Sequence, residues 1–106
     1  MTTRQITHDR TQAHFKTRWT LQTLIAGVVA DALRSTETVV GRTEARLRSF
    51  EEKYQLSTVN FLERYGNDEF QETLELNEWI GESRMLKRLQ EKAERLRENL
   101  ETEDNS

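Results

Sequence analysis

The stretch RLRSFEEKYQLSTVNFLERY, residues 46–65, marks a turning point in this chain, because one helix ends in it and another begins. The charged residues that lead up to Tyr54 continue a long amphipathic pattern, and a tight connection follows at Gln55 and Leu56. Ser57 has the chemistry of an N-cap residue, whose side-chain oxygen accepts a hydrogen bond from a free backbone N–H of the first helical turn. We therefore expect one helix to end at residue 54 and a new one to begin after Ser57.

The new helix is expected to be short and to cover residues 58–66. Leu56, just before the cap, can pack onto Phe61 as a hydrophobic staple. Gly66 and Asn67 are typical of a helix C-terminus followed by a turn. This helix would connect two longer ones.

Before the turning point, apolar residues recur at alternating intervals of four and three over residues 15–54, which predicts one long helix packed along a seam. A helix of this length is not stable in water without another helix beside it. Further apolar residues between 21 and 33 widen the stripe, so we expect several helices to meet there, as in a dimeric bundle. A break near Gly41 stays open. The residues expected to mediate self-association are Trp19, Ala26, Val29, Leu33, Val40, Leu47 and Phe50.

The C-terminal half returns to the same spacing. Residues 68–82 hold six acidic residues interleaved with aromatic and aliphatic ones, and no basic residue. From Trp79 the four-three spacing predicts a second long helix over residues 74–100, followed by an acidic tail over 101–106. This helix can pack against the first as a hairpin, or against its own copy in a dimeric bundle or coiled coil. The expected fold class is therefore all-α.

Composition and charge fit one small helical domain over residues 15–100. Of the 106 residues, 34% are hydrophobic and 33% are charged, so stability is expected to come from helix pairing or from a partner rather than from a large core. Residues 1–50 carry eight Lys or Arg against four Asp or Glu, whereas residues 51–106 carry eight against 15, for a total of −3. Residues 1–14 are expected to be a flexible basic arm.

Residue types that catalysis or metal binding would need are scarce. The chain has no cysteine, and His8 and His14 are six positions apart rather than one helical turn apart. The four glycines are isolated, so no phosphate-binding loop is present in the sequence. We expect no enzyme activity, no cofactor and no metal site. The most apolar run, residues 24–30, is too short to cross a membrane, and a cytoplasmic location without membrane contact is expected.

One pattern runs through residues 44–96. It consists of a helix end with Lys-Tyr, a Ser-capped helix containing Phe, a Gly/acidic turn and an acidic-aromatic segment with Glu-Trp. In these features the chain resembles a family of small bacterial and archaeal proteins that form the antitoxin half of toxin–antitoxin pairs. It departs from the family at Asn60, where Glu is usual, in a more acidic turn after Gly66, and in the first forty residues, which have no counterpart. The matching residues are Phe50, Glu51, Lys53, Tyr54, Ser57, Phe61, Arg64, Tyr65, Gly66, Glu78 and Trp79.

The resemblance implies binding and neutralisation of a cognate toxin, often a ribonuclease. The acidic, aromatic and amphipathic composition of residues 68–82 also favours docking onto a basic groove, with a solvated helix face as the alternative. The residues expected to bind the toxin are Phe61, Tyr65, Phe70, Glu72, Glu75, Glu78, Trp79 and Ile80.

Two other functions remain open. The chain can be a structural coiled-coil adaptor that acts only through helix pairing, in which case residues such as Leu33, Val40 and Leu47 matter and the acidic surface does not. The weaker alternative is a DNA-binding autoregulator that uses the basic N-terminal arm, because Lys and Arg side chains neutralise phosphates. No base-reading motif accompanies that arm.

Overall fold

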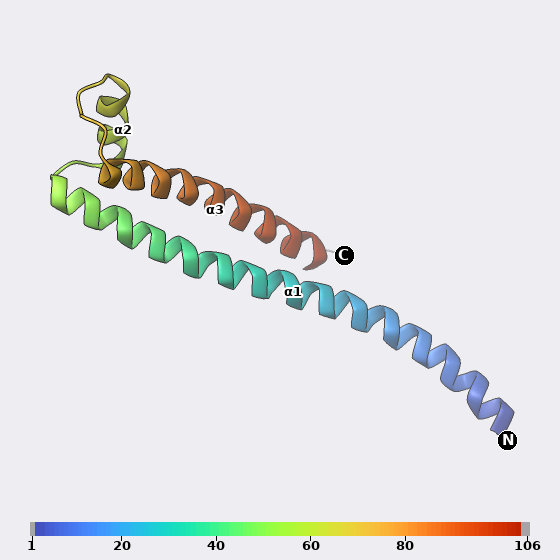
Figure 1. The fold of residues 1–106 in the computed structure, drawn as a ribbon. Coiled ribbons are helices and arrows are strands. Elements are labelled where there is room, and N and C mark those ends of the chain that lie inside the picture. The colour runs from blue at the N-terminus through green and yellow to red at the C-terminus, as the bar shows by residue number, and fades with distance from the viewer. Residues whose placement is uncertain (1, 105–106) are drawn as a thin grey trace.

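The computed structural model describes the backbone of residues 2–104 and the side chains of residues 20–102. Three helices make up the described chain: α1 (Thr2–Tyr54), α2 (Thr58–Gly66) and α3 (Leu74–Asp104). No strand occurs among these residues, so the expected all-α class is confirmed. The molecule is an elongated rod, 83 × 20 × 18 Å. Figure 1 shows α3 running back along α1, with α2 projecting at the end where the chain turns.

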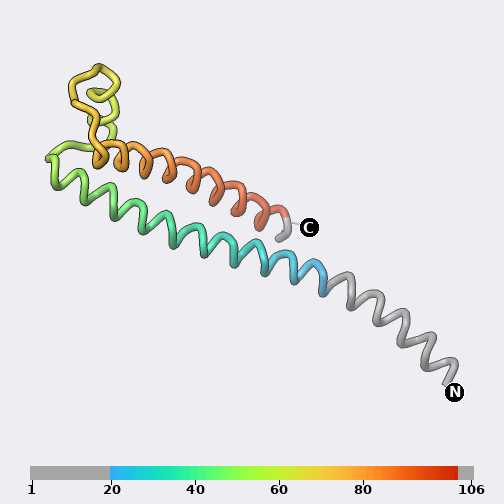
Figure 2. Tube along the Cα trace, viewed as in Figure 1, coloured from blue at the N-terminus to red at the C-terminus, as the bar shows by residue number. Residues whose placement is uncertain are grey.

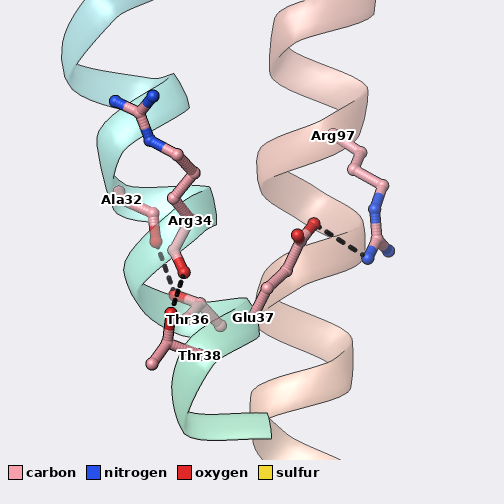
Figure 3. A network of polar contacts seen from close by, with 6 residues as sticks. All are labelled: Ala32, Arg34, Thr36, Glu37, Thr38 and Arg97. Atoms are coloured by element: carbon pink, nitrogen blue, oxygen red, sulfur yellow. Dashed lines mark hydrogen bonds and ion pairs between the residues drawn. The ribbon is translucent and has the colours of Figure 1, made fainter. Parts of the chain in front are cut away.

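The two long helices form an antiparallel hairpin, one of the two arrangements expected from the sequence. Its register is visible in three ion pairs between α1 and α3. Lys53 Nζ lies 2.5 Å from Glu75 Oε1, Arg46 Nη1 lies 3.0 Å from Glu82 Oε1, and Arg97 Nη2 lies 3.2 Å from Glu37 Oε1. Figure 3 shows the last pair bridging the two helices. Ion pairs that are open to solvent on at least one side add little stability, so these three report the register of the helices more than they hold the helices together.

The seam of α1 is covered by α3 along its C-terminal half. Thr36, Thr43 and Leu47 are buried there, four and seven positions apart in the spacing read from the sequence. The helix continues through Gly41 without the break that was left open. Gly41 is exposed, and a Cβ added to it would meet no atom within 4 Å, so no close helix approach requires a glycine at this position.

The hinge between α1 and α2 follows the local sequence signals. α1 ends at Tyr54, and Gln55 takes a left-handed conformation with φ 52° that reverses the chain. Ser57 is the N-cap, and its Oγ accepts a hydrogen bond from the Asn60 backbone N–H at 3.2 Å. A second free N–H, that of Thr58, donates to the Glu51 carboxylate at 2.7 Å. A carboxylate from α1 thus satisfies one of the free N–H groups in the first turn of α2.

Both outer ends of the hairpin are more helical than the sequence indicated. The long helix was expected from residue 15 and the second from 74 to 100, whereas α1 begins at Thr2 and α3 continues to Asp104. The segments called a basic arm and an acidic tail are therefore helical over residues 2–14 and 101–104. α2 spans Thr58–Gly66, the range expected from its cap and its Gly-Asn end.

One hydroxyl in the hairpin interface is unsatisfied. Thr43 is fully buried, and its Oγ1 has no hydrogen-bond partner among the described residues. The nearby Thr36 is also buried, but its Oγ1 donates to the Ala32 carbonyl at 2.8 Å, as Figure 3 shows. A buried polar group without a partner lowers stability, whereas a bonded one does not.

We predict that Thr43→Val raises the free energy of unfolding by about 1 kcal/mol, because it replaces an unpaired buried hydroxyl with a methyl group of similar size. Urea unfolding followed by circular dichroism at 222 nm measures the change. Thr36→Val is the matched control, since it removes a hydroxyl that has a partner, and it should give no gain. Equal gains in both variants would contradict the assignment of Thr43 as the unsatisfied hydroxyl.

Candidate functional site

An aromatic cluster ties the three helices together at the hinge. It consists of Phe50 and Tyr54 from α1, Phe61 and Tyr65 from α2, Phe70 from the α2–α3 connection and Trp79 from α3. Each helix contributes because its apolar positions recur at three- and four-residue spacing and therefore share one face. Leu47, Leu56, Leu76 and Ile80 pack around this cluster. The hydrophobic core cluster of the described residues therefore lies at the hinge.

Trp79 lies at the centre of the cluster. Its ring stacks on Phe61 with centroids 3.9 Å apart and planes 7° apart, and on Phe50 at 5.5 Å and 9°. Tyr54 stacks on it at 5.5 Å and 24°. The indole N–H, which needs an acceptor when buried, donates to Thr58 Oγ1 at 2.9 Å. One side chain of α3 therefore contacts both α1 and α2.

The burial of this cluster corrects part of the expected toxin-binding set. Phe61 and Trp79 were expected to contact a partner. Both side chains are 0% exposed, because residues of their own chain cover them. A partner cannot contact them unless the hinge opens. Tyr65, Phe70 and Ile80 are half-buried and pack against the same core, so only part of each ring or side chain faces outward.

The acidic members of that set are divided between two environments. Glu75 is engaged within the hairpin, where the Lys53 ammonium and then the Tyr54 hydroxyl hold the pKa of its carboxyl below the ordinary value. The hydrogen bond to Glu75 in turn raises the pKa of both Lys53 and Tyr54. Glu72 and Glu78 are exposed, and neither forms an ion pair within the described part of the chain.

The hinge end carries an excess of negative charge. Residues 58–80 hold six acidic residues and one basic residue, Arg64, which pairs with Glu69 at 3.2 Å. Four carboxylates of this segment have no ion-pair partner among the described residues. We call them the acidic surface: Glu63, Asp68, Glu72 and Glu78.

Apolar side chains are also exposed at the hinge end. Val59 and Leu74 are 74% and 77% exposed, and Leu62 is 37% exposed. Glu78 further lines a hollow of about 590 Å³ between α1 and α3, together with Phe50 and Met85. Glu82 also lines this hollow, and its Oε2 atom is buried with no hydrogen-bond partner among the described residues. This end therefore offers acidic groups beside apolar surface.

The expected self-association residues also fall into two groups. Leu47 is buried in the hinge core, Phe50 stacks on Trp79, and Val40 is half-buried, all within this hairpin. α3 of the same chain therefore occupies this stretch of the seam, and a second copy is not needed to cover Leu47 or Phe50. Ala26, Val29 and Leu33 are half-buried near the end of α3. The side chain of Trp19 lies outside the described residues.

Among the described side chains of α1, a group of four large apolar ones is uncovered, and none of the four was among the expected self-association residues. Leu21 is 54% exposed, Leu24 58%, Ile25 52% and Val28 68%. Their spacing places them together on one face of α1, turned away from the seam. We call these four residues the α1 flank. The sequence signal was the widened stripe between 21 and 33, which the seam alone does not explain.

Over the part of the chain that the structure describes, no group of three or more His, Cys, Asp or Glu is placed to hold a metal ion. The side chains of His8 and His14 and of the basic residues in the first 18 positions lie outside it. Within the same described chain, no helix has a long enough apolar stretch to cross a membrane. No protein-family model, curated protein sequence or solved structure matches this chain. The antitoxin resemblance therefore stays a prediction.

We predict that Trp79→Ala lowers the free energy of unfolding by about 3–5 kcal/mol, the usual range for removing a buried large aromatic side chain. Thermal unfolding by circular dichroism measures this loss. Trp79→Phe should retain most of the stacking and lose mainly the hydrogen bond to Thr58, a change of about 1 kcal/mol. A Trp79→Ala variant as stable as the wild type would show that the cluster does not hold the hinge.

The Lys53–Glu75 pair should make hinge stability depend on pH in a defined window. The pKa of Glu75 is lowered from 4.5, so its contribution is complete above 4.5 and is lost as the pH falls through the folded-state value. The pKa values of Lys53 and Tyr54 are raised from 10.5 and 10.0, so their contribution is complete below 10.0 and is lost as the pH rises through the folded-state values.

The measurement is the difference in urea midpoint between the wild type and Glu75→Gln from pH 3 to 11. We expect a plateau between the two limits and a decline on either side. High salt should shrink the plateau, because both groups are exposed to solvent. A pH-independent difference would mean that the carboxylate acts only through packing.

Proposed function

We propose that this protein binds a basic protein partner at the hinge end of its hairpin and acts as an antitoxin-like inhibitor of that partner. The observation that carries the proposal is the acidic surface, whose carboxylates have no cation of their own within the described chain. The resemblance to antitoxins over residues 44–96 supplies the class of partner, a toxin such as a ribonuclease. The stable aromatic cluster beneath provides a rigid support rather than the contact itself.

Charge complementarity suits this role. A basic toxin surface would be steered toward the acidic surface, and its Lys or Arg side chains would pair with Glu72 and Glu78. Exposed Leu62 and Leu74, with the outward parts of Tyr65 and Phe70, offer apolar contacts in the same region. Binding there would leave the core of the hairpin closed.

A second candidate function is a coiled-coil adaptor that acts through helix pairing. The observation that favours it is the α1 flank, since soluble monomers seldom leave several large apolar side chains exposed side by side. An adaptor would need the α1 flank and not the acidic surface. The two roles use opposite ends of the described molecule and are compatible with each other.

The experiment is tagged purification from the native host, with identification of the proteins that co-purify. We expect a stoichiometric small basic protein, encoded beside this chain, that arrests growth when it is expressed alone. Glu72→Lys with Glu78→Lys should reduce its recovery by roughly tenfold or more, because like charges then face each other.

The matched control is Glu91→Lys with Glu94→Lys, which makes the same change in net charge on exposed positions of α3 away from the hinge. This control should retain the basic protein. Equal losses in both double variants would point to net charge rather than to the acidic surface. Recovery of non-basic partners that neither variant affects would favour the adaptor.

A further inference from the structure

We propose that the α1 flank is covered by a second copy of this chain, which pairs with it in antiparallel orientation across a two-fold axis between Leu24 and Ile25. The proposal rests on the helix-pairing role described above and names its partner. It does not depend on the acidic surface or on the antitoxin role.

The structure first shows why the hairpin does not cover this face itself. α3 packs on the seam side of α1, where Ala26, Val29 and Leu33 are half-buried, whereas the α1 flank points elsewhere and is more than half exposed. α3 also stops near this point. The pairs of 75 with 53 and 97 with 37 place Asp104 level with about residues 24–30 of α1, at 1.5 Å per residue in both helices. Figure 2 shows α3 ending beside the middle of α1.

The helix beyond that point needs a neighbour. α1 begins at Thr2, so more than 20 residues, roughly 30 Å of helix, run past the end of α3. A helix of this length without a packing partner is not stable in water. The apolar residues that a partner could cover are those of the α1 flank and those at the seam positions expected from the sequence.

The spacing of the α1 flank is self-complementary. Positions 21, 24, 25 and 28 read the same in both directions about a centre between 24 and 25. In an antiparallel pair Leu21 of one copy therefore faces Val28 of the other, and Leu24 faces Ile25. This is the isologous contact that a two-fold dimer requires, in which one surface meets itself.

Charge selects the antiparallel orientation over the parallel one. The last turns of α3, residues 98–104, hold four acidic residues and no basic one, and the same two pairs place them level with about residues 24–36 of α1. Antiparallel pairing brings residues 13–25 of the second copy to that level, a segment with Lys16, Arg18 and no acidic residue. Parallel pairing would instead bring the two acidic ends of α3 to the same level.

The dimer proposed here is a long rod with its two hinges at opposite ends. Residue n of one α1 lies level with residue 49 − n of the other. The two Tyr54 residues are therefore separated by about 59 helical rises, roughly 90 Å. The acidic surfaces of the two copies would lie at the outer ends, away from the dimer contact.

The first test is the mass of the full-length protein in solution, measured by sedimentation over a range of concentrations. We expect a dimer for the wild type. Leu24→Glu should weaken dimerisation by about tenfold or more, since two carboxylates would meet at the axis, while circular dichroism reports whether the hairpin stays folded. Leu74→Glu, which changes an exposed leucine outside the α1 flank, should remain dimeric.

A mixture of two oppositely charged variants shows whether misfolding, rather than charge repulsion, causes the loss of dimerisation. Leu24→Glu and Leu24→Lys should each be monomeric alone and form a heterodimer when mixed, because opposite charges then meet at the axis. A wild-type monomer at all concentrations, or a Leu24→Glu variant that dimerises as well as the wild type, would overturn the proposal. The double variant of Glu72 and Glu78 should stay dimeric, which separates this test from that of the proposed function.

Orientation is tested by disulfide formation, which the absence of native cysteine makes simple. Two cysteines form a disulfide only when their Cα atoms are within about 7 Å. A mixture of Leu21→Cys with Val28→Cys should cross-link under mild oxidation, whereas Leu21→Cys alone should not. Efficient cross-linking of Leu21→Cys with itself would establish parallel pairing and overturn the antiparallel arrangement.

Discussion

The stacking of Trp79 on Phe61 is the interaction on which the rest of this structure depends. The two rings stack face to face and so join α3 to α2. Trp79 also stacks on Phe50 and Tyr54, which brings α1 into the same cluster. Because these residues lie at the turn, they set where α3 starts along α1, and the ion pairs farther along the hairpin follow that register. The hairpin has few buried side chains, so the aromatic contacts at its hinge end determine how α1 and α3 are aligned.

A second constraint is the difference in length between the two long helices. α1 has 53 residues and α3 has 31, so the hairpin cannot satisfy all of the apolar surface of α1 within one chain. The hinge end is closed by the aromatic cluster and leaves on its outside acidic groups that have no ion pair within the described chain, next to a few exposed apolar side chains. The other end is open and leaves apolar side chains on its outside. The two surfaces that we propose for a charged partner and for another helix therefore lie at separate locations.

Local signals predicted the hinge well. Ser57, Gly66 and Asn67 act on the backbone groups next to them, so their effect does not depend on the tertiary fold. The choice of partner for an apolar face is different, because periodicity shows that a face is buried without showing what buries it. Leu47 and Phe50 were therefore assigned to a second copy although α3 covers them, and Phe61 and Trp79 were assigned to a toxin although they face each other. The helix over residues 2–14 was not predicted, because this segment has no periodic apolar pattern.

The long sequence separation within the hairpin has a consequence for its synthesis. Glu37 meets Arg97, a residue made 60 positions later, and at about 5–20 residues per second this delay is roughly 3–12 s on the ribosome. Once Tyr54 has been made, α1 is complete while α3 is still unfinished, so the seam and the flank of α1 are both open for the later part of that interval. Neighbouring nascent chains on one messenger RNA can therefore meet through α1 before either hairpin closes. When α3 then packs on α1, it would cover the seam, and only the α1 flank would stay available for the contact between copies proposed above.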